Sequence, residues 1–102
     1  MINELEFTVQ ELIIKDKYGI HARPAASIVK QCALYEEKIE IYLKKKEENA
    51  DVECSCRSVI ELLQLDAGNG TKLKLYVKGK DEKAKEIAKE LSDLISSDFE
   101  QI

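Results

Sequence analysis

The chain has 102 residues, a length that suits one domain with a single compact core. It carries 20 acidic and 16 basic residues, a formal charge of −4, and both signs are interspersed along the sequence. The one run of lysines, residues 44–46, is followed at once by Glu47 and Glu48, so we interpret it as part of a solvated hairpin tip. These features argue against a nucleic-acid-binding protein.

The N-terminus indicates where the protein works. Residues 1–6 lack the basic region and the continuous apolar segment of a signal peptide. No other segment approaches the roughly 20 apolar residues that are needed to cross a bilayer. We therefore expect a cytoplasmic protein that does not enter the membrane.

Cysteine usage agrees with that expectation. The three cysteines, Cys32, Cys54 and Cys56, are an odd number without a secretion signal, which predicts free thiols rather than disulfides. Cys54 and Cys56 are separated by one residue, unlike the usual zinc knuckle with two intervening residues. We therefore expect no metal site and interpret both as small apolar core residues.

The first predicted strand has an irregular pattern. Apolar residues alternate from Leu5 to Val9 and again from Leu12 to Ile14, one step out of phase. This pattern predicts either a strand with a bulge or an N-terminal extension over residues 1–10 that leads into the strand.

A helix follows this strand. Pro24 suits its first turn, where a backbone N–H would have no partner. The positions i, i+3, i+4 and i+7 of its apolar stripe are Ala25, Ile28, Val29 and Cys32.

Two alternating segments, residues 39–43 and 52–56, then predict a β-hairpin. The polar segment between them predicts a long tip over residues 44–51. After the hairpin we expect a short helix and then a break in the chain at residues 68–70. One side of that helix is formed by Val59, Leu62 and Leu63.

Residues 73–77 alternate as the last strand, and Asp81 is the expected N-cap of the final helix. That helix has the clearest apolar face in the sequence. Its members are Ala84, Ile87, Ala88, Leu91, Leu94 and Ile95.

The predicted order is strand, helix, strand, strand, helix, strand, helix. Each strand has one apolar and one polar face, so the sheet should be covered on one side only. The three helices must pack on that side to bury their apolar stripes. The sequence therefore predicts an α+β open-faced sandwich, a four-stranded antiparallel sheet with three helices on one face, as a single domain over residues 1–102.

Residues 18–26 concentrate the candidate chemistry. They contain His21, the only histidine, just before the first helix begins. The N-terminal amides of a helix point outward, and the helix dipole favours an anion there. A phosphoryl group on the histidine would therefore lie among the first residues of the helix, Ala22, Pro24 and Ala25.

Arg23 adds a fixed positive charge that can reach two phosphate oxygens. From the spacing of these residues alone, a second interpretation stays open. In that interpretation His21 only caps the helix and Arg23 is a solvated neighbour.

Two blocks of the sequence resemble a known family. Residues 19–25, Gly-Ile-His-Ala-Arg-Pro-Ala, resemble the active-site motif of HPr, the histidine-containing phosphocarrier family of the phosphoenolpyruvate-dependent sugar phosphotransferase system. Residues 58–65, followed by a glycine turn at 67–71, resemble the second helix of that family and the turn after it. The resemblance covers residues 12–96.

The resemblance implies a phosphoryl relay. Phosphorylated enzyme I would donate to Nδ1 of His21, and the group would then pass to the A domain of a sugar-specific enzyme II. Arg23 would assist the transfer. No cofactor is implied in the chain itself, and we expect a monomer, because the surface of a carrier must dock successive partners.

The resemblance also implies a partner surface around the histidine and on the second helix. Core packing stays open as the alternative for its members on that helix. The residues concerned are Ile20, Val59, Ile60 and Leu63.

Ser58 has two interpretations. In some members of the family the matching serine is phosphorylated by an HPr kinase/phosphorylase, which would make Ser58 a regulatory site and the kinase a partner. The alternative is a capping box, in which Ser58 binds helix amides and Glu61 reaches back to the start of the helix. Glu61 also replaces a small residue common in kinase-regulated members.

These observations leave three alternative functions for the chain. The first is a phosphocarrier, a protein substrate in a relay rather than an enzyme with its own turnover. The second is a regulatory HPr-like adaptor, in a nitrogen-type branch or in carbon signalling, without a direct role in sugar uptake. The third is an αβ binding module in which His21 has no phosphoryl role.

Overall fold

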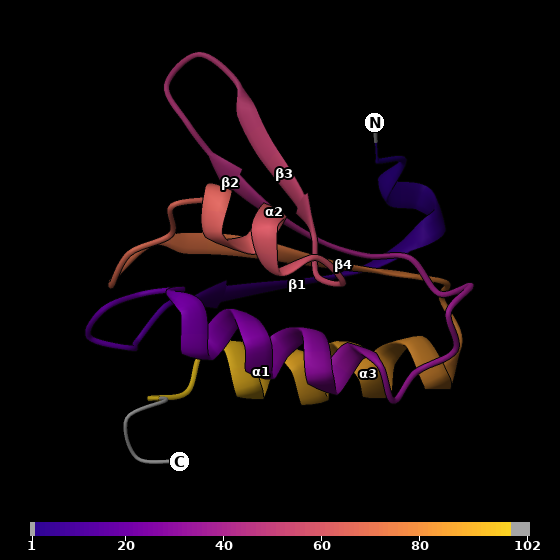
Figure 1. Ribbon diagram of the computed structural model, residues 1–102. Helices are drawn as coiled ribbons and strands as arrows, with labels where there is room; N and C mark the ends of the chain where they lie inside the picture. The colour runs from indigo at the N-terminus through magenta and orange to yellow at the C-terminus, as the bar shows by residue number, and fades with distance from the viewer. Residues whose placement is uncertain (1, 99–102) are drawn as a thin grey trace.

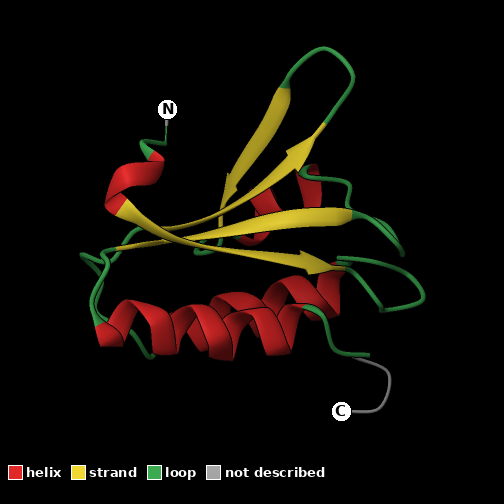
Figure 2. Cartoon of the chain, turned by 180° about the vertical axis from the view of Figure 1, so that it is seen from behind, coloured by secondary structure: helices red, strands yellow, loops and turns green. Residues whose placement is uncertain are grey.

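The computed structural model describes residues 2–98 and has two layers (Figure 1). A four-stranded antiparallel sheet in the order β1-β4-β2-β3 forms one layer, and α1 and α3 lie side by side beneath it (Figures 1 and 2). The predicted element order and fold class are confirmed. The elements are a short 3-10 helix η1 (Glu4–Glu6), β1 (Phe7–Ile13), α1 (Ala22–Cys32), β2 (Ile41–Lys46), β3 (Asp51–Ser55), α2 (Val59–Gln64), β4 (Lys72–Lys78) and α3 (Glu82–Ile95).

The core lies between the sheet and the helices. The apolar stripes predicted for α1 and α3 face it, with Val29 and Leu94 only partly buried at its margin. In α2, Leu62 is buried but Leu63 is 41% exposed, so the prediction that both share one apolar side is wrong. Each fully buried Leu or Ile contributes about 2 kcal/mol of hydrophobic stabilisation. Such side chains are Ile14, Ile28, Ile41, Leu43, Leu62, Leu65, Leu75, Ile87, Leu91 and Ile95.

The pairing of β1 with β4 explains the irregular pattern of the first strand. The register runs without interruption from Phe7 opposite Lys78 to Ile13 opposite Lys72, so the predicted bulge is wrong. Val9 lies opposite Tyr76 on the open face, whereas Leu12 lies opposite Leu73 on the helix face. The change of phase therefore marks a strand that places apolar side chains on different faces in its two halves. Residues 7–10 belong to this strand.

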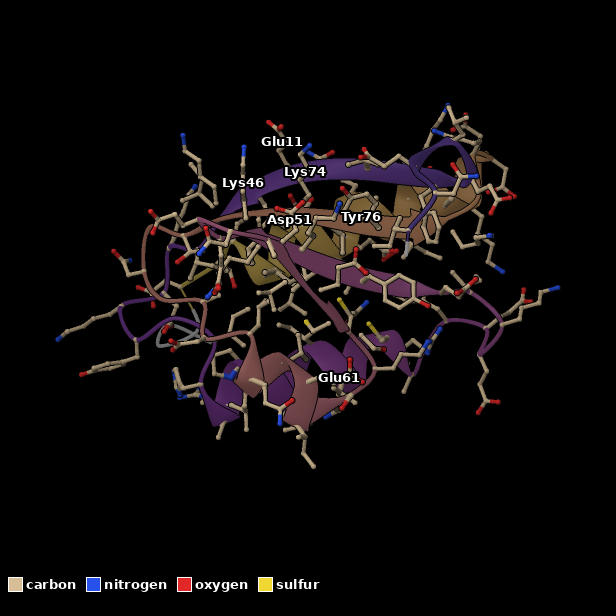
Figure 3. The ribbon with its side chains drawn as sticks, turned by 90° about the horizontal axis from the view of Figure 1, so that it is seen from above. Glu11, Lys46, Asp51, Glu61, Lys74 and Tyr76 are labelled. Carbon is tan, nitrogen blue, oxygen red and sulfur yellow. The ribbon has the colours of Figure 1, made fainter. Side chains whose placement is uncertain are left out.

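Part of the open face is apolar, which the alternation of the strands did not predict. Tyr76 is on this face, yet it is 0% exposed. The Phe7 ring meets it edge-on with centroids 6.2 Å apart, and the Lys44 Nζ lies 5.2 Å from the centre of the Tyr76 ring. Figure 3 looks onto this face and shows Tyr76 among charged side chains, with Lys74 and Asp51 labelled beside it. Lysine stems cover the ring while their ammonium groups stay near water.

The β2–β3 hairpin is more regular than the sequence indicated. The strands pair as far as Lys46 opposite Asp51, and a hydrogen bond of 3.0 Å from Glu47 N–H to Ala50 C=O closes a short tip. The side chains of Lys44 and Lys45 are only 18% and 13% exposed. The prediction of a solvated tip over residues 44–51 is therefore wrong for Lys44 and Lys45, which lie on the two faces of a strand, whereas Lys46 is exposed.

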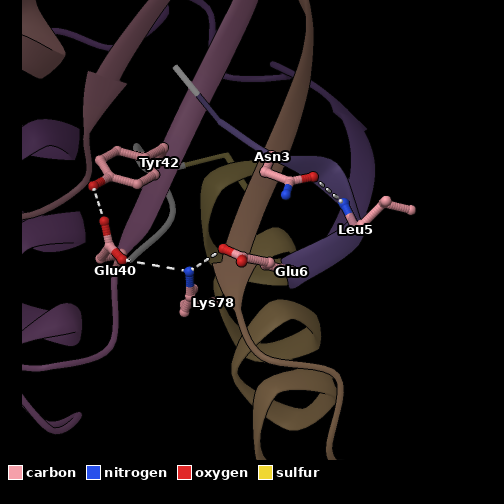
Figure 4. A network of polar contacts seen from close by, with 6 residues as sticks. All are labelled: Asn3, Leu5, Glu6, Glu40, Tyr42 and Lys78. Atoms are coloured by element: carbon pink, nitrogen blue, oxygen red, sulfur yellow. Dashed lines mark hydrogen bonds and ion pairs between the residues drawn. The ribbon is translucent and has the colours of Figure 1, made fainter.

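The N-terminal segment is attached to the sheet by a polar network (Figure 4). Lys78 Nζ lies 2.6 Å from Glu6 and 3.9 Å from Glu40. The Tyr42 hydroxyl donates a hydrogen bond of 2.6 Å to Glu40, and this bond to a carboxylate raises the pKa of Tyr42 to about 12. The network joins the segment before β1 to the end of β4 and the start of β2.

Arg57 connects the two layers of the fold, and the sequence interpretation did not single it out. Its guanidinium donates hydrogen bonds to the carbonyl oxygens of Cys32 (2.8 Å), Glu36 (2.7 Å) and Ile39 (3.0 Å). These carbonyls lie at the end of α1 and in the segment that leads to β2. Arg57 therefore fixes the C-terminal end of the helix that begins at His21.

The three cysteines are free and buried, as predicted. Burial raises the pKa of Cys32 to about 11 and that of Cys54 to about 12, and raises the pKa of Cys56 well above its ordinary value. Within residues 2–98, no group of three or more His, Cys, Asp or Glu side chains is placed to hold a metal ion. No helix in that range has both the length and the apolar character needed to span a membrane.

Candidate functional site

The candidate site lies at the start of α1, where His21 is the N-cap residue. The chain arrives there in an extended conformation (φ −105°, ψ −168°), and the His21 side chain makes no capping hydrogen bond. The His21 carbonyl accepts a hydrogen bond of 2.9 Å from Ala25 N–H, which begins the helix. Pro24 occupies the first turn, where the missing N–H costs nothing. The histidine ring is therefore left available for other contacts.

A second loop supports the segment that carries the histidine. Ile20 N–H donates a hydrogen bond of 2.8 Å to the Ala67 carbonyl, and Gly70 N–H donates one of 2.8 Å to the Ile14 carbonyl. The Asn69 side-chain amide donates to the Asp16 carbonyl at 3.2 Å. The glycine turn after α2 thus holds the loop before α1 at several points.

Gly19 is required by this contact. Its φ is +73°, and a Cβ built on it would lie 2.3 Å from the Ala67 oxygen and 2.6 Å from the Gly68 Cα. Any side chain at this position would meet backbone atoms, which cannot move aside. The glycine therefore lets the two loops approach each other directly before the histidine.

Asp16 lies beneath the histidine, and its side chain is only 1% exposed. Its Oδ2 accepts a hydrogen bond of 3.0 Å from Tyr18 N–H and lies 3.4 Å from His21 Nε2. The sequence analysis missed this residue. A carboxylate five positions before the histidine was visible, but only the turn of the loop at Gly19 brings it under the ring.

The orientation of the histidine ring distinguishes its two nitrogens. Nε2 is buried, whereas the side chain as a whole is 40% exposed. The Tyr18 ring packs edge-on against the histidine, with centroids 5.8 Å apart and an angle of 89° between the planes. The exposed part of the side chain therefore lies away from Nε2.

The first turn of α1 offers fewer amides than the sequence suggested. Pro24 has no N–H and is buried, and the N–H of Ala25 already donates to the His21 carbonyl. Neither residue therefore offers a free N–H to an anion, and their part in a phosphate site stays a prediction. Ala22, the first helical residue, retains an N–H that faces outward by helix geometry. Arg23 follows it on the same turn, with an exposed side chain.

The residues proposed for the partner surface have different environments. Ile20 is 6% exposed and belongs to the core, so its side chain offers little surface to a partner. Val59 is partly buried and packs against the core. Ile60 is 68% and Leu63 is 41% exposed, so core packing does not explain them. A docking role for these two exposed residues stays a prediction.

Ser58 is the N-cap of α2, as the capping interpretation predicted. Its Oγ accepts a hydrogen bond of 3.2 Å from Glu61 N–H. The Glu61 carboxylate does not complete the box at Ser58, because its Oε1 accepts a hydrogen bond of 3.0 Å from Ser55 N–H. Glu61 therefore ties the end of β3 to α2, and phosphorylation of Ser58 stays a prediction.

Comparisons with known proteins agree with this architecture. Residues 8–97 match the family described as the PTS HPr component phosphorylation site. The chain is 35% identical over 88 residues to the phosphocarrier protein HPr of Borreliella burgdorferi, covering 86% of this chain and 93% of the relative. It is 33% identical over 76 residues to that of Treponema pallidum, covering 74% and 80%.

Solved structures show the same fold. The HPr-C-His protein of Thermoanaerobacter tengcongensis superposes with a TM-score of 0.72 at 30% identity, covering 91% of this chain and 96% of that one. The phosphocarrier protein HPr from Bacillus anthracis superposes with a TM-score of 0.71 at 21% identity, covering 87% and 96%. At that identity the second structure is similar in fold alone.

Proposed function

Because this chain belongs to the HPr family of phosphocarrier proteins, we propose that it accepts a phosphoryl group on His21 and passes it to another protein. The donor in this proposal is phosphorylated enzyme I, and the acceptor is the A domain of a sugar-specific enzyme II. The observation that carries the proposal is the placement of His21. It lies at a helix N-cap, with Nε2 buried and the side chain as a whole 40% exposed.

The chemistry of the transfer uses this placement. The lone pair on Nδ1 attacks the phosphorus of the donor, and the product is a phosphoryl group at the N-terminus of α1. The outward N–H of Ala22 and the helix dipole favour the negative oxygens there. A helix dipole contributes about 0.3–1 kcal/mol to an exposed anion, so it assists the transfer but does not drive it alone.

Arg23 supplies the larger electrostatic contribution in this proposal. It is an exposed residue, two positions after His21 on the first turn of α1. A guanidinium can donate two parallel hydrogen bonds to phosphate oxygens, and a hydrogen bond to a charged group contributes about 1.5–3 kcal/mol. We propose that Arg23 neutralises the charge of the phosphoryl group while it is transferred.

The exposed apolar side chains of α2 support a protein partner. Ile60 and Leu63 project from a helix that packs against α1, the helix that begins at His21. An apolar contact beside a phosphorylated histidine suits docking of another protein over the reacting atom. In this role the chain acts as a protein substrate in a relay, and each transfer is completed by its partner.

The proposal is tested by intact-protein mass spectrometry after incubation with phosphoenolpyruvate, magnesium and enzyme I. One phosphoryl adduct that is lost in mild acid is expected. The His21→Ala variant should remain folded, because the side chain makes no capping hydrogen bond, and should show no adduct. An adduct on that variant would contradict the assignment of His21.

A second step distinguishes the carrier from the regulatory adaptor. Phosphorylated protein is mixed with isolated enzyme II A domains, and loss of its adduct is followed together with gain on the acceptor. Transfer supports the carrier. A protein that is loaded by enzyme I but passes nothing to any A domain of its host would favour the adaptor.

A further inference from the structure

Asp16 is the one acidic or basic side chain that is fully buried among residues 2–98. Burying a carboxylate costs several kcal/mol unless other groups compensate its charge. Its Oδ2 accepts a hydrogen bond from Tyr18 N–H at 3.0 Å and faces His21 Nε2 at 3.4 Å. Nε2 is itself buried, and within residues 2–98 it forms no hydrogen bond of good geometry; the polar group that it faces is the Asp16 carboxylate at 3.4 Å.

The Tyr18 contact does not by itself require a carboxylate. An oxygen that binds the N–H two residues later forms an Asx turn, and an asparagine can form the same turn without a charge. The turn also gives no reason for the ring nitrogen to lie against the carboxylate. The distance of 3.4 Å is longer than a strong N–H···O bond, but contacts of reacting groups are often long before a partner binds and then shorten.

Asp16 distinguishes the two ring nitrogens. An ionised carboxylate only accepts hydrogen bonds, so the nitrogen that faces it must carry a proton. Neutral imidazole has a single N–H, and a proton on Nε2 leaves the lone pair on Nδ1. We propose that Asp16 is a positioning residue that keeps Nε2 protonated throughout the phosphoryl cycle of His21. This inference rests on the function proposed above.

The transfer then needs no proton movement on the histidine. The Nδ1 lone pair forms a bond to the phosphorus, and the bond from the phosphorus to the donor breaks, returning its electron pair to the donor. The ring becomes a phosphorylated imidazolium that still carries Nε2–H, and Asp16 balances its positive charge. When the acceptor attacks the phosphorus, the N–P electron pair returns to Nδ1 and restores the same neutral tautomer.

The other charged or titratable groups around the ring do not replace this role. The Tyr18 ring meets His21 through an edge contact, and Lys17 Nζ lies 5.3 Å from the centre of that tyrosine ring. Arg23 is a cation and favours the phosphoryl group rather than a protonated Nε2. The loop after α2 carries a further carboxylate, Asp66, which within residues 2–98 forms no hydrogen bond or ion pair with the ring; its backbone carbonyl accepts a hydrogen bond from Lys45.

The first test measures the tautomer in the unphosphorylated protein by nitrogen-15 NMR of the His21 ring. The wild-type protein should carry the proton on Nε2 above the pH at which the ring becomes neutral. Asp16→Asn keeps an acceptor oxygen without the charge, so the same tautomer should dominate. Asp16→Ala removes the acceptor and should give a mixture. An unchanged tautomer in Asp16→Ala would overturn the proposal.

The second test measures hydrolysis of phosphohistidine as a function of pH, after chemical phosphorylation with phosphoramidate. The ring-protonated form loses its phosphoryl group fastest, and a nearby carboxylate keeps the ring protonated to higher pH. In Asp16→Asn, which removes that carboxylate charge, the midpoint of the hydrolysis profile should therefore move to lower pH. The matched control Asp66→Asn removes one carboxylate from the neighbouring loop and should leave the midpoint in place.

The outcomes separate this inference from the proposed function. Neither test uses enzyme I. If enzyme I fails to load the protein, that result contradicts the proposed carrier function, and both tests of the role of Asp16 can still be carried out. An unchanged midpoint in Asp16→Asn, in a protein with a native amide spectrum, would overturn the role of Asp16. The phosphocarrier function would be unaffected by that result. Because Asp16→Asn fills the same volume, it decides the question if Asp16→Ala does not fold.

Discussion

Gly19 and Ala67 approach each other so closely that no side chain fits between them. A Cβ on Gly19 would lie 2.3 Å from the Ala67 carbonyl oxygen. The same oxygen accepts a hydrogen bond of 2.8 Å from Ile20 N–H, one residue before His21. The turn after α2 therefore determines where the histidine lies, although the two segments are far apart in the sequence.

Gly19→Ala should destabilise the protein by about 3 kcal/mol. Left-handed backbone at φ +73° and overlap with the Ala67 carbonyl each add about 1–3 kcal/mol of strain. Urea unfolding followed by circular dichroism measures the change. Gly68→Ala is the matched control, because nothing lies within 4 Å of its added Cβ, and it should change stability by less than about 1 kcal/mol. Equal effects of the two substitutions would contradict this account of the loop.

Arg23→Ala should slow phosphoryl transfer from enzyme I by about 10- to 100-fold, the equivalent of the roughly 1.5–3 kcal/mol of a charge-assisted hydrogen bond. The transfer rate of Arg23→Lys should lie between those of the wild type and of Arg23→Ala, because lysine keeps the charge but cannot donate two parallel hydrogen bonds. Rapid-quench measurement with phosphorylated enzyme I gives the rates. Lys30→Ala, which removes another exposed cation from α1, is the control and should leave the rate unchanged.

Ile60→Ser should weaken docking of the partner proteins without altering stability. Ile60 is 68% exposed on α2, so its loss removes little from the core. The concentration of enzyme I at half-maximal transfer rate should rise, while phosphoramidate should load His21 as before. Leu34→Ser is the control, because Leu34 is 75% exposed just beyond the opposite end of α1. If both substitutions raise that concentration equally, the docking surface is not centred on α2.

The three cysteines should resist alkylation in the folded protein. Thiolate is the reactive form, and burial raises the pKa of Cys32 to about 11 and that of Cys54 to about 12. At pH 8 the thiolate fraction is therefore very small, and it grows only as the pH rises toward these values. Iodoacetamide labelling followed by mass spectrometry should show no adducts at pH 8 and three adducts in urea. Rapid labelling of one native cysteine would contradict its burial.

Local patterns in the sequence were enough to predict much of the fold. The i, i+3, i+4, i+7 spacing in α1 and α3 was read correctly because each helix packs only one face against the sheet. The placement of His21 at a helix start followed from Pro24 and from the apolar stripe after it. In both cases neighbouring residues along the chain carry the information.

The errors lie where distant segments meet. The Asp16 carboxylate and His21 Nε2 come together only through the turn at Gly19, which the loop after α2 holds in place. Arg57 was overlooked because its acceptors are backbone carbonyls, which every residue has, so the sequence does not indicate which of them it binds. The bulge predicted in β1 was wrong because the alternation cannot tell which face of a strand is covered.

Tyr76 offers a test of that partly covered open face. Its hydroxyl is buried, and within residues 2–98 no hydrogen bond of good geometry satisfies it. Tyr76→Phe should therefore keep the free energy of unfolding or raise it by about 1 kcal/mol, because phenylalanine retains the ring beneath Lys44 and removes an unsatisfied polar group.

Tyr42→Phe is the matched comparison on the neighbouring strand. It removes the hydrogen bond of 2.6 Å to Glu40 and should cost about 1–2 kcal/mol. Urea unfolding measures both variants, and a loss of more than about 1 kcal/mol in Tyr76→Phe would show that the hydroxyl has a stabilising partner.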